Sequence, residues 1–322
     1  MQHFQELARQ FETYLKQYDF FPPGPENLYV PCRSILASGG KHIRPTLCLM
    51  ACELFGNLSE DAFHAAVALE LFHNFTLIHD DIMDHAPLRR GKPTIHTEYG
   101  LASGILSGDV MNIYAYEQLR KINPAHLPEI LRIFNKVAIE VCEGQQLDMD
   151  YEAFDEVGID EYLEMISLKT SVLLATSLQI GTILGNGNSH DAENIYLFGK
   201  SLGMAFQLQD DYLDAFGTGA QVGKRLGGDI RSDKKTYLHI VCKSVMDDKQ
   251  SELLNSFSAL SPEEKVAKTI SFYKDLGIDK RTRQIILKFS NQAFDYLNKI
   301  DKPEARLKPL KEVAAFLLDR AY

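Results

Sequence analysis

Apolar residues recur at helical spacing along almost the whole of this chain. Near the N-terminus they lie three or four positions apart, at Phe4, Leu7, Phe11 and Leu15. Side chains at that spacing share one face of an α-helix. No convincing run alternates β-branched and polar residues as a half-buried strand would. The pattern therefore predicts an all-α fold, a single bundle of roughly ten or more helices whose central members, apolar nearly all round, are buried.

Proline and glycine divide this pattern into separate helices. Phe21-Pro22-Pro23-Gly24-Pro25 ends the first helix, and a loop from Ser38 ends at Pro45, which suits the first turn of the next helix. Ser59 is a candidate N-cap for the long helix that runs to Asp84. Later helices are expected at about 100–121, 127–148, 159–185, 189–214, 236–246, 262–275, 280–299 and 303–320, with a glycine-rich connection over 215–235.

The composition is that of an ordinary globular protein. The chain has 322 residues, of which 45% are hydrophobic and 24% charged, and we expect residues 1–322 to form a single domain. The net charge of -10 argues against a nucleic-acid partner, because no basic face is available to neutralise many phosphates.

No segment of the sequence is expected to span a membrane. The longest apolar runs, near Ala65 to Leu71 and Ser171 to Leu184, are too short or too interrupted by Ser, Thr and Gln. The five cysteines form no Cys-x-x-Cys pair, and the N-terminal residues are unlike a signal peptide. We therefore expect reduced core thiols in a soluble, cytoplasmic protein.

Two acidic pentapeptides stand out, and each closes a long helical stretch. Both have the form Asp-Asp-x-x-Asp, at Asp80 to Asp84 and at Asp210 to Asp214. On a helix of about 3.6 residues per turn, three such carboxylates share one face and repel one another. Stop signals follow both motifs, so the acids lie at the negative end of the helix dipole.

This arrangement requires positive charge. Repulsion and the dipole each cost a few tenths of a kcal/mol to about 1 kcal/mol. One such pentapeptide would more often be a solvated acidic face, but two at matching helix ends favour a metal site. Carboxylate oxygens around a hard cation indicate Mg²⁺, usually completed by substrate phosphates. The predicted ligands are the six motif acids, Asp80, Asp81, Asp84, Asp210, Asp211 and Asp214.

Basic residues recur near glycine or proline and supply groups that could bind phosphate. Lys169 is exceptional, because it stands inside an otherwise apolar helical stretch. Six motif carboxylates would balance about three divalent cations, which leaves about seven basic groups for two diphosphates of roughly two to three charges each. The seven basic residues are Lys41, Arg44, Arg89, Arg90, Lys169, Lys224 and Lys234.

Together these motifs resemble the ordered motif set of the trans-isoprenyl diphosphate synthases, the polyprenyl synthetase family. The resemblance covers about residues 30 to 240. The family often has arginine where His42 stands. The motifs are Gly39-Gly40-Lys41-His42-Ile43-Arg44-Pro45, the run from Glu70 to Asp84, Arg89-Arg90-Gly91, Lys169-Thr170, the run from Phe206 to Asp214, and Gly223-Lys224.

The resemblance implies Mg²⁺-dependent, head-to-tail condensation of isopentenyl diphosphate with an allylic diphosphate. It also implies a homodimer with the isoprenoid synthase fold, a helical bundle around a central apolar cavity. Asp80 and Asp84 would hold two Mg²⁺ ions and Asp210 a third, and the other three motif acids would support them. The released diphosphate would accept the proton, so that no side-chain base is needed.

The same resemblance implies roles for the remaining residues. Thr170 and Gln207 would face the allylic carbon and stabilise its developing positive charge, and with Lys169 they are the expected catalytic residues. The allylic diphosphate would be held by Arg89, Lys169, Lys224 and Lys234, and isopentenyl diphosphate by Lys41, Arg44, His73 and Arg90.

Product length would be set along the helix that carries Asp80. Thr76 lies one turn before it, and Phe75 and Phe72 lie roughly 7 and 12 Å away along the axis. A single aromatic residue five positions before the motif resembles the archaeal-type geranylgeranyl pattern. We therefore expect a C20 product, with C15 as the alternative if Phe72 closes the tunnel early.

Two other functions use similar motifs. A class I terpene cyclase also ionises an allylic diphosphate, but its second metal motif typically mixes Asn, Ser or Thr with Glu, and it needs no second diphosphate site. A non-catalytic synthase subunit tends to lose motif acids, whereas this chain retains all six.

Overall fold

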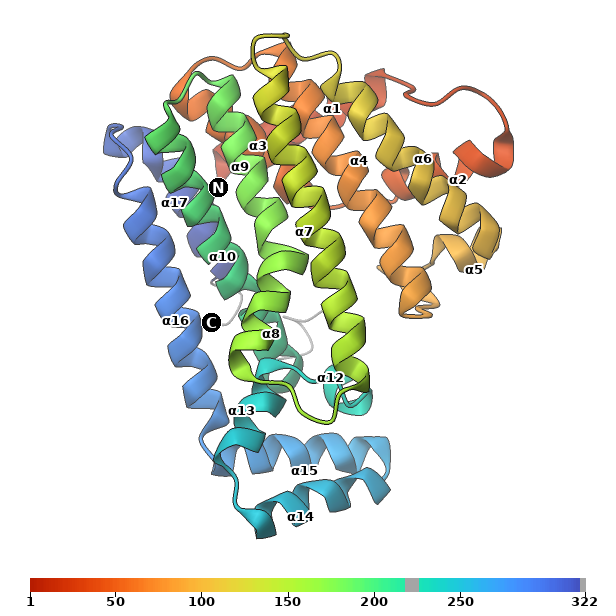
Figure 1. Cartoon of the computed structure of the whole chain (residues 1–322), viewed down its shortest axis with the longest axis vertical. Coiled ribbons are helices and arrows are strands. Elements are labelled where there is room, and N and C mark those ends of the chain that lie inside the picture. Colours follow the sequence, from red (N-terminus) through yellow and green to blue (C-terminus); the bar gives the residue numbers. More distant parts are fainter. Residues whose placement is uncertain (218–225, 319–322) are drawn as a thin grey trace. The chain divides into compact units, whose positions relative to one another are not determined.

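The computed structural model describes residues 1–217 and 226–318, and helices dominate this part of the chain (Figure 1). The all-α prediction is confirmed. Contacts divide the chain into two compact units, and the single-domain prediction stays a prediction. Unit 1 comprises Met1–Lys136, Thr176–Ile195 and Lys302–Pro309, and unit 2 comprises Val137–Ala175, Tyr196–Asp301 and the C-terminal segment from Leu310.

Unit 1 is built around α4, which packs against α3 and α6. The eight consecutive residues from Ala65 to Phe72 are all buried, as expected of a helix that is apolar nearly all round. Ser59 caps α4, because its side chain accepts a hydrogen bond from the Ala62 amide. The elements are α1 (Gln2–Gln17), α2 (Glu26–Ala37), α3 (Ile43–Phe55), α4 (Glu60–Met83), β1 (Leu88–Arg89), β2 (Lys92–Pro93), α5 (Ile95–Tyr99) and α6 (Leu101–Leu119).

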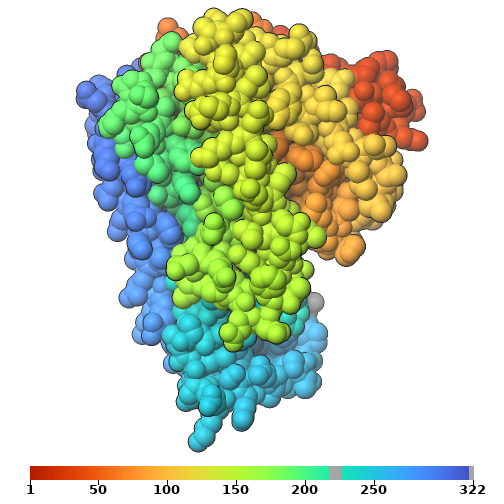
Figure 2. Space-filling model, viewed as in Figure 1, coloured from red at the N-terminus to blue at the C-terminus, as the bar shows by residue number. Residues whose placement is uncertain are grey.

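Unit 2 has its own apolar core, which includes Met165, Leu208, Leu238 and Ile278. In the space-filling view the side chains of α14 and α15 cover one end of this unit (Figure 2). Its elements are α8 (Ile159–Ile166), the π-helical segment η1 (Ser167–Ser171), α12 (Gly228–Arg231), α13 (Tyr237–Val245), α14 (Asp248–Ser256), the 3-10 turn η2 (Phe257–Ala259), α15 (Pro262–Asp275) and α16 (Ile278–Leu297). One boundary between the units, at Asp301 and Lys302, lies between two helices. The other four fall inside α7 (Leu127–Ala153), α9 (Val172–Leu184), α10 (Ser189–Phe216) and α17 (Glu304–Leu318).

Several short elements differ from the sequence prediction. The helices α5, α12 and α14 were not expected, and the helix expected over 159–185 contains η1. The expected loop after the first acidic motif contains a two-stranded antiparallel hairpin, with Leu88 opposite Pro93. Its two turn residues, Arg90 and Gly91, both have positive φ, of 53° and 74°, which suits a tight hairpin turn. Strands of two residues are too short to show alternation in a sequence.

The structure bears on two expectations drawn from composition, and it overturns the one about the cysteines. By length and composition alone, the helical stretch Ile159–Leu184 could cross a membrane, although 78% of its most apolar window is buried, as in a core helix. All five cysteines are free, but Cys142 is exposed on α7 and is not a core thiol, because it lies on the outer face of that helix.

Candidate active site

The first acidic motif closes α4, as predicted. Asp80 and Asp81 lie in its last turn, and Asp84 is the C-cap. Arg89 on β1 binds two of these acids: its Nε donates to both oxygens of Asp81 at 2.9 and 2.8 Å, and its Nη2 donates to Asp80 at 3.1 Å. Burial by itself would lower the pKa of Arg89, but the hydrogen bonds and charges of Asp81 and Asp80 together outweigh burial, so the pKa is raised above its ordinary value. Asp81 is only 3% exposed, whereas Asp84 is exposed.

Arg44 and His73 form a second cluster in unit 1. Arg44 Nη1 donates to His73 Nε2 at 3.0 Å. Burial and then the charge of Arg44 hold the pKa of His73 well below its ordinary value, so the ring is neutral. Because Nε2 accepts from Arg44, the ring proton resides on Nδ1. Among the described residues, His73 Nδ1 and Arg44 Nε are buried donors without a partner, which makes them available to an anion.

Lys41 and Arg90 are the other two residues predicted to hold isopentenyl diphosphate. Lys41 is exposed, three residues before Arg44. Arg90, at the hairpin turn, donates to the carbonyl oxygen of Gly39. The structure therefore ties the Gly39–His42 loop, which leads into α3, to the hairpin after the acidic motif.

The three residues predicted to set product length lie on α4, before the acids. Phe72 is 1% exposed, and its ring packs against Phe75 and edge-on against Phe134, with centroid distances of 5.5 and 5.3 Å. Phe75 is half-buried, and Thr76 donates through Oγ1 to the His73 carbonyl oxygen at 2.8 Å.

In unit 2, the second motif lies in the last turns of α10, also as predicted. Asp210 is exposed, whereas Asp211 is buried. Burial raises the pKa of Asp211 to about 6, although hydrogen bonds from Tyr162 and Gln207 oppose that effect. The Tyr162 hydroxyl donates to Oδ2 of Asp211. Both oxygens of Asp214 accept backbone N–H groups at the start of α12, at 3.1 and 3.0 Å.

The amide of Gln207 has a fixed orientation. Its Nε2 donates to Asp211 Oδ1 at 3.1 Å, and its Oε1 accepts from Thr170 Oγ1 at 3.4 Å. Asp211 thus acts on the predicted catalytic pair, Thr170 and Gln207, by holding the amide nitrogen. Tyr162, which holds Asp211 in turn, was not found from the sequence, because nothing marks it among the apolar residues of its helix.

Lys169 lies in the π-helical segment η1, a distortion often found at functional sites. Its Nζ donates to Asp148 Oδ2 at 2.6 Å, and Lys234 Nζ lies 3.9 Å from the same oxygen. Asp148, a buried residue of α7, therefore joins two lysines predicted to hold the allylic diphosphate. Asp148 was not predicted as a site residue, although Gly144, one turn earlier, indicates a close approach of another helix. Lys224 lies outside the described residues.

The side chains present fit Mg²⁺ by their chemistry. The two motifs offer carboxylate oxygens, the ligands that this ion prefers. Across residues 1–217 and 226–318, no group of three or more His, Cys, Asp or Glu side chains is arranged to hold a metal ion. Mg²⁺ suits such a protein, because it is commonly bound by one or two carboxylates together with water and substrate phosphates.

The chain is similar to known prenyl synthases in sequence. The Polyprenyl synthetase family matches residues 25–276. A short chain isoprenyl diphosphate synthase of Methanocaldococcus jannaschii is 40% identical over 254 residues, which are 78% of this chain and 75% of that protein. A geranylgeranyl diphosphate synthase of Methanosarcina mazei is 36% identical over 301 residues, which are 92% and 91% of the two chains.

Solved structures of prenyl synthases also match this chain in fold. The crystal structure of a geranylgeranyl pyrophosphate synthase matches with a TM-score of 0.93 and 39% identity over 99% of both chains. Another such synthase, from Corynebacterium glutamicum and described as complexed with isoprenyl diphosphate and magnesium, matches with a TM-score of 0.84 and 26% identity over 98% of this chain and 97% of its own. Since the family match covers most of the sequence, this chain belongs to the polyprenyl synthetase family and is a prenyltransferase.

Proposed function

We propose that this chain condenses isopentenyl diphosphate with an allylic diphosphate, either dimethylallyl, geranyl or farnesyl diphosphate, to give geranylgeranyl diphosphate. The observation that carries the proposal is the Arg44–His73 pair, which offers buried donors to an anion. A cyclase needs no second diphosphate site, so this pair favours a synthase. Farnesyl diphosphate is the alternative product.

The allylic diphosphate lies against the acidic motifs in this proposal. Three Mg²⁺ ions held by Asp80, Asp84 and Asp210 would neutralise charge on the leaving diphosphate when bound. Magnesium in the related Corynebacterium structure supports the choice of ion. Lys169, held by Asp148, donates to the same diphosphate. Arg89, Lys224 and Lys234 are assigned there by resemblance.

The reaction breaks the allylic C–O bond and forms a C–C bond. Gln207 has its amide nitrogen bound by Asp211, so its carbonyl oxygen is left to stabilise the allylic cation together with the Thr170 oxygen. The diphosphate of isopentenyl diphosphate binds Lys41, Arg44, Arg90 and the Nδ1 proton of His73. The alkene attacks the cation, and the released diphosphate takes the proton that is lost.

The test is a direct assay. Purified full-length protein is incubated with Mg²⁺, labelled isopentenyl diphosphate and each allylic primer, and products are separated by chromatography. We expect elongated prenyl diphosphates that disappear when EDTA removes the metal. Lack of elongation with every primer would reject the synthase, and a hydrocarbon formed from the allylic substrate alone would indicate a cyclase. Activity that appears only with a second, different chain would indicate a partner subunit.

Product length is tested at Phe72 and Phe75. Replacement of either ring by alanine removes bulk along α4, and the buried Phe72 ring is held in place by Phe134. We therefore expect Phe75→Ala to extend the product by one five-carbon unit, and Phe72→Ala to extend it separately. Chain lengths that stay unchanged in both variants would show that the floor of the cavity lies elsewhere.

We also propose a homodimer formed through α6. Apolar side chains are exposed on one broad face of this helix, at Leu101, Ile105, Leu106 and Ile113. Exposed apolar stripes commonly mark protein interfaces. Light scattering after size-exclusion chromatography should give twice the mass of the chain, and Ile113→Asp should favour the monomer. A monomeric wild-type protein at micromolar concentration would refute the proposal.

A further inference from the structure

His42 is a buried polar residue that the proposed mechanism does not use. It is 8% exposed and has a left-handed backbone, with φ of 44°. Left-handed geometry is uncommon for a residue other than glycine, so the surrounding structure must hold it. His42 stands between Lys41 and Arg44, two residues proposed to bind isopentenyl diphosphate.

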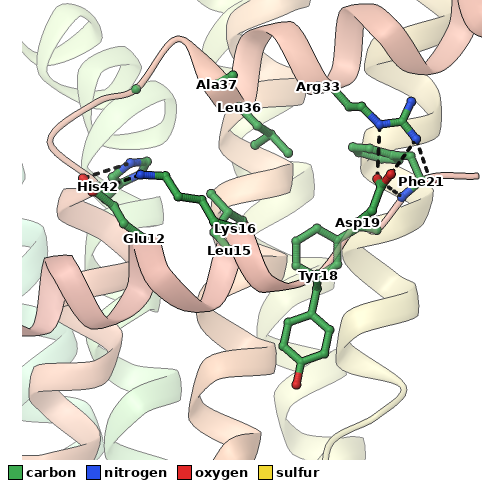
Figure 3. A pocket seen from close by; sticks show the side chains of 12 residues that line it. Glu12, Leu15, Lys16, Tyr18, Asp19, Phe21, Arg33, Leu36, Ala37 and His42 are labelled. Carbon is green, nitrogen blue, oxygen red and sulfur yellow. Dashed lines mark hydrogen bonds and ion pairs between the residues drawn. The ribbon is translucent and has the colours of Figure 1, made fainter. Parts of the chain in front are cut away.

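The ring of His42 is held from two helices. Its Nδ1 lies 2.9 Å from Glu70 Oε1 on α4, and its Nε2 lies 3.9 Å from Glu12 Oε1 on α1. Phe11 packs against the ring with a centroid distance of 5.4 Å. Figure 3 shows His42 and Glu12 facing one another at the wall of a cavity, which Leu36 also lines. The cavity has a volume of about 330 Å³.

Glu70 is the deeper partner. It is 7% exposed, and it also accepts from the side chain of Asn74 at 3.3 Å. A carboxylate buried to this degree requires hydrogen bonds or a compensating charge. Burial lowers the pKa of Arg44 to about 10, and the negative charge on Glu70 opposes that effect. Glu70 therefore acts on both His42 and Arg44, and it lies three residues before His73.

The other end of the same loop is also fixed. Arg90 donates to the Gly39 carbonyl oxygen, and a Cβ added at Gly40 would lie 2.9 Å from Arg90 Nη1. The loop is thus held at Gly39 by the hairpin and at His42 by the core. Lys41 lies between these two fixed points.

We propose that His42 and Glu70 are a positioning pair that fixes the Gly39–His42 loop and the start of α3 for binding the diphosphate of isopentenyl diphosphate. The inference rests on the proposed function and deepens it. His42 donates to Glu70 and touches neither substrate, and the pair acts through Lys41 and Arg44. Loss of the pair should weaken binding of isopentenyl diphosphate and leave the allylic site unaffected.

The test compares the Michaelis constants of the two substrates. In His42→Ala and Glu70→Gln we expect the KM for isopentenyl diphosphate to rise at least tenfold, with kcat and the allylic KM within twofold of wild type. His42→Arg should restore the KM to within about threefold, because a guanidinium can donate to both Glu70 and Glu12 and the adjacent cavity offers room. His64→Ala is the control, a half-buried histidine of α4 that contacts Gln118.

Several results would overturn the inference: equal changes in both KM values, no change in either, or no recovery in His42→Arg. If His42→Ala does not fold, as judged by its melting curve, the isosteric Glu70→Gln variant carries the comparison. Calorimetric binding of isopentenyl diphosphate without primer separates the two proposals. A wild-type protein that binds isopentenyl diphosphate but makes no product would reject the synthase, whereas wild-type affinity in both variants would reject the pair.

Discussion

At the scale of single residues, the carboxylates of the motifs and of Asp148 differ in exposure, and Asp80 and Asp214 are half-buried. Asp84 and Asp210 are exposed, whereas Asp81, Asp148 and Asp211 are buried and bound by named donors. A buried carboxylate with a fixed partner orients that partner more than it attracts a solvated ion. Asp148 is the clearest case, because it holds Lys169.

Asp148→Asn removes the charge that Lys169 faces at 2.6 Å. We expect the free energy of unfolding to fall by about 1–3 kcal/mol, since a partly buried ammonium loses its ionic partner. We also expect kcat/KM for the allylic substrate to fall about tenfold, or about 1.4 kcal/mol, because Lys169 loses its fixed orientation. Urea unfolding and steady-state kinetics measure the two effects.

Asp150→Asn on the same helix is the matched control. Asp150 is half-buried and accepts a side-chain hydrogen bond from the exposed Gln146. An asparagine oxygen can accept the same bond, so the substitution should change stability by no more than about 0.5 kcal/mol. Equal stabilities of the two variants would mean that the ion pair does not hold Lys169 in place.

At the scale of elements, the π-helical segment η1 is enclosed by glycines of two other helices. A Cβ on Gly144 of α7 would lie 2.3 Å from the Lys169 backbone nitrogen, and one on Gly203 of α10 would lie 2.7 Å from Ser171 Cα. These contacts are with backbone or with Cα, which has no rotamer to change. The two helices therefore approach η1 as closely as they do only because both positions are glycine.

Gly144→Ala tests this close approach, because the sign of the change in the free energy of unfolding depends on it. Within a helix, glycine to alanine ordinarily stabilises by roughly 0.5–1 kcal/mol. Here the added methyl group must displace η1, so we expect a loss of about 1–3 kcal/mol and reduced synthase activity. Thermal unfolding measures the change, with Glu143→Ala at the exposed neighbouring position as control. A stabilised Gly144→Ala protein would contradict the packing described.

At the scale of the whole molecule, pH dependence reports on buried groups outside the proposed site. His239, on α13, is partly buried, and burial followed by the charge of Lys243 lowers its pKa to about 4. In the unfolded chain this histidine binds a proton as the pH falls below about 6.5. In the folded chain it binds the proton only as the pH falls to about 4. The contribution of His239 to the free energy of unfolding is therefore fully present above about pH 6.5, and it is lost as the pH falls toward 4.

His239→Gln should remove this contribution. Between pH 7 and pH 4 the wild-type free energy of unfolding should fall by up to about 3 kcal/mol more than that of the variant, because one pKa unit corresponds to about 1.4 kcal/mol. Denaturant unfolding at several pH values measures the difference. His190→Gln, a substitution of a histidine at an exposed position, is the control variant. Parallel stability curves for wild type and His239→Gln would show that His239 is not responsible.

The sequence by itself determined the features that depend on neighbours along the chain. The helix α4, capped by Ser59 and Asp84, is such a feature, because capping and periodicity involve residues within a turn or two. The positions of both acidic motifs at helix ends follow for the same reason, and the ordered motifs indicated the family. The hairpin at Arg90 escaped prediction, because its strands are too short to form a pattern.

Only the tertiary structure decided which distant side chains meet. Asp148 and Lys169 are 21 positions apart, and His42 and Glu70 are 28 apart, and neither pair has a signature in local sequence. The π-helical turn that carries Lys169 is likewise a product of packing, because it depends on the absence of a side chain at Gly144. Local rules act through bonds between near neighbours, whereas these contacts form only when separate helices pack and exclude water.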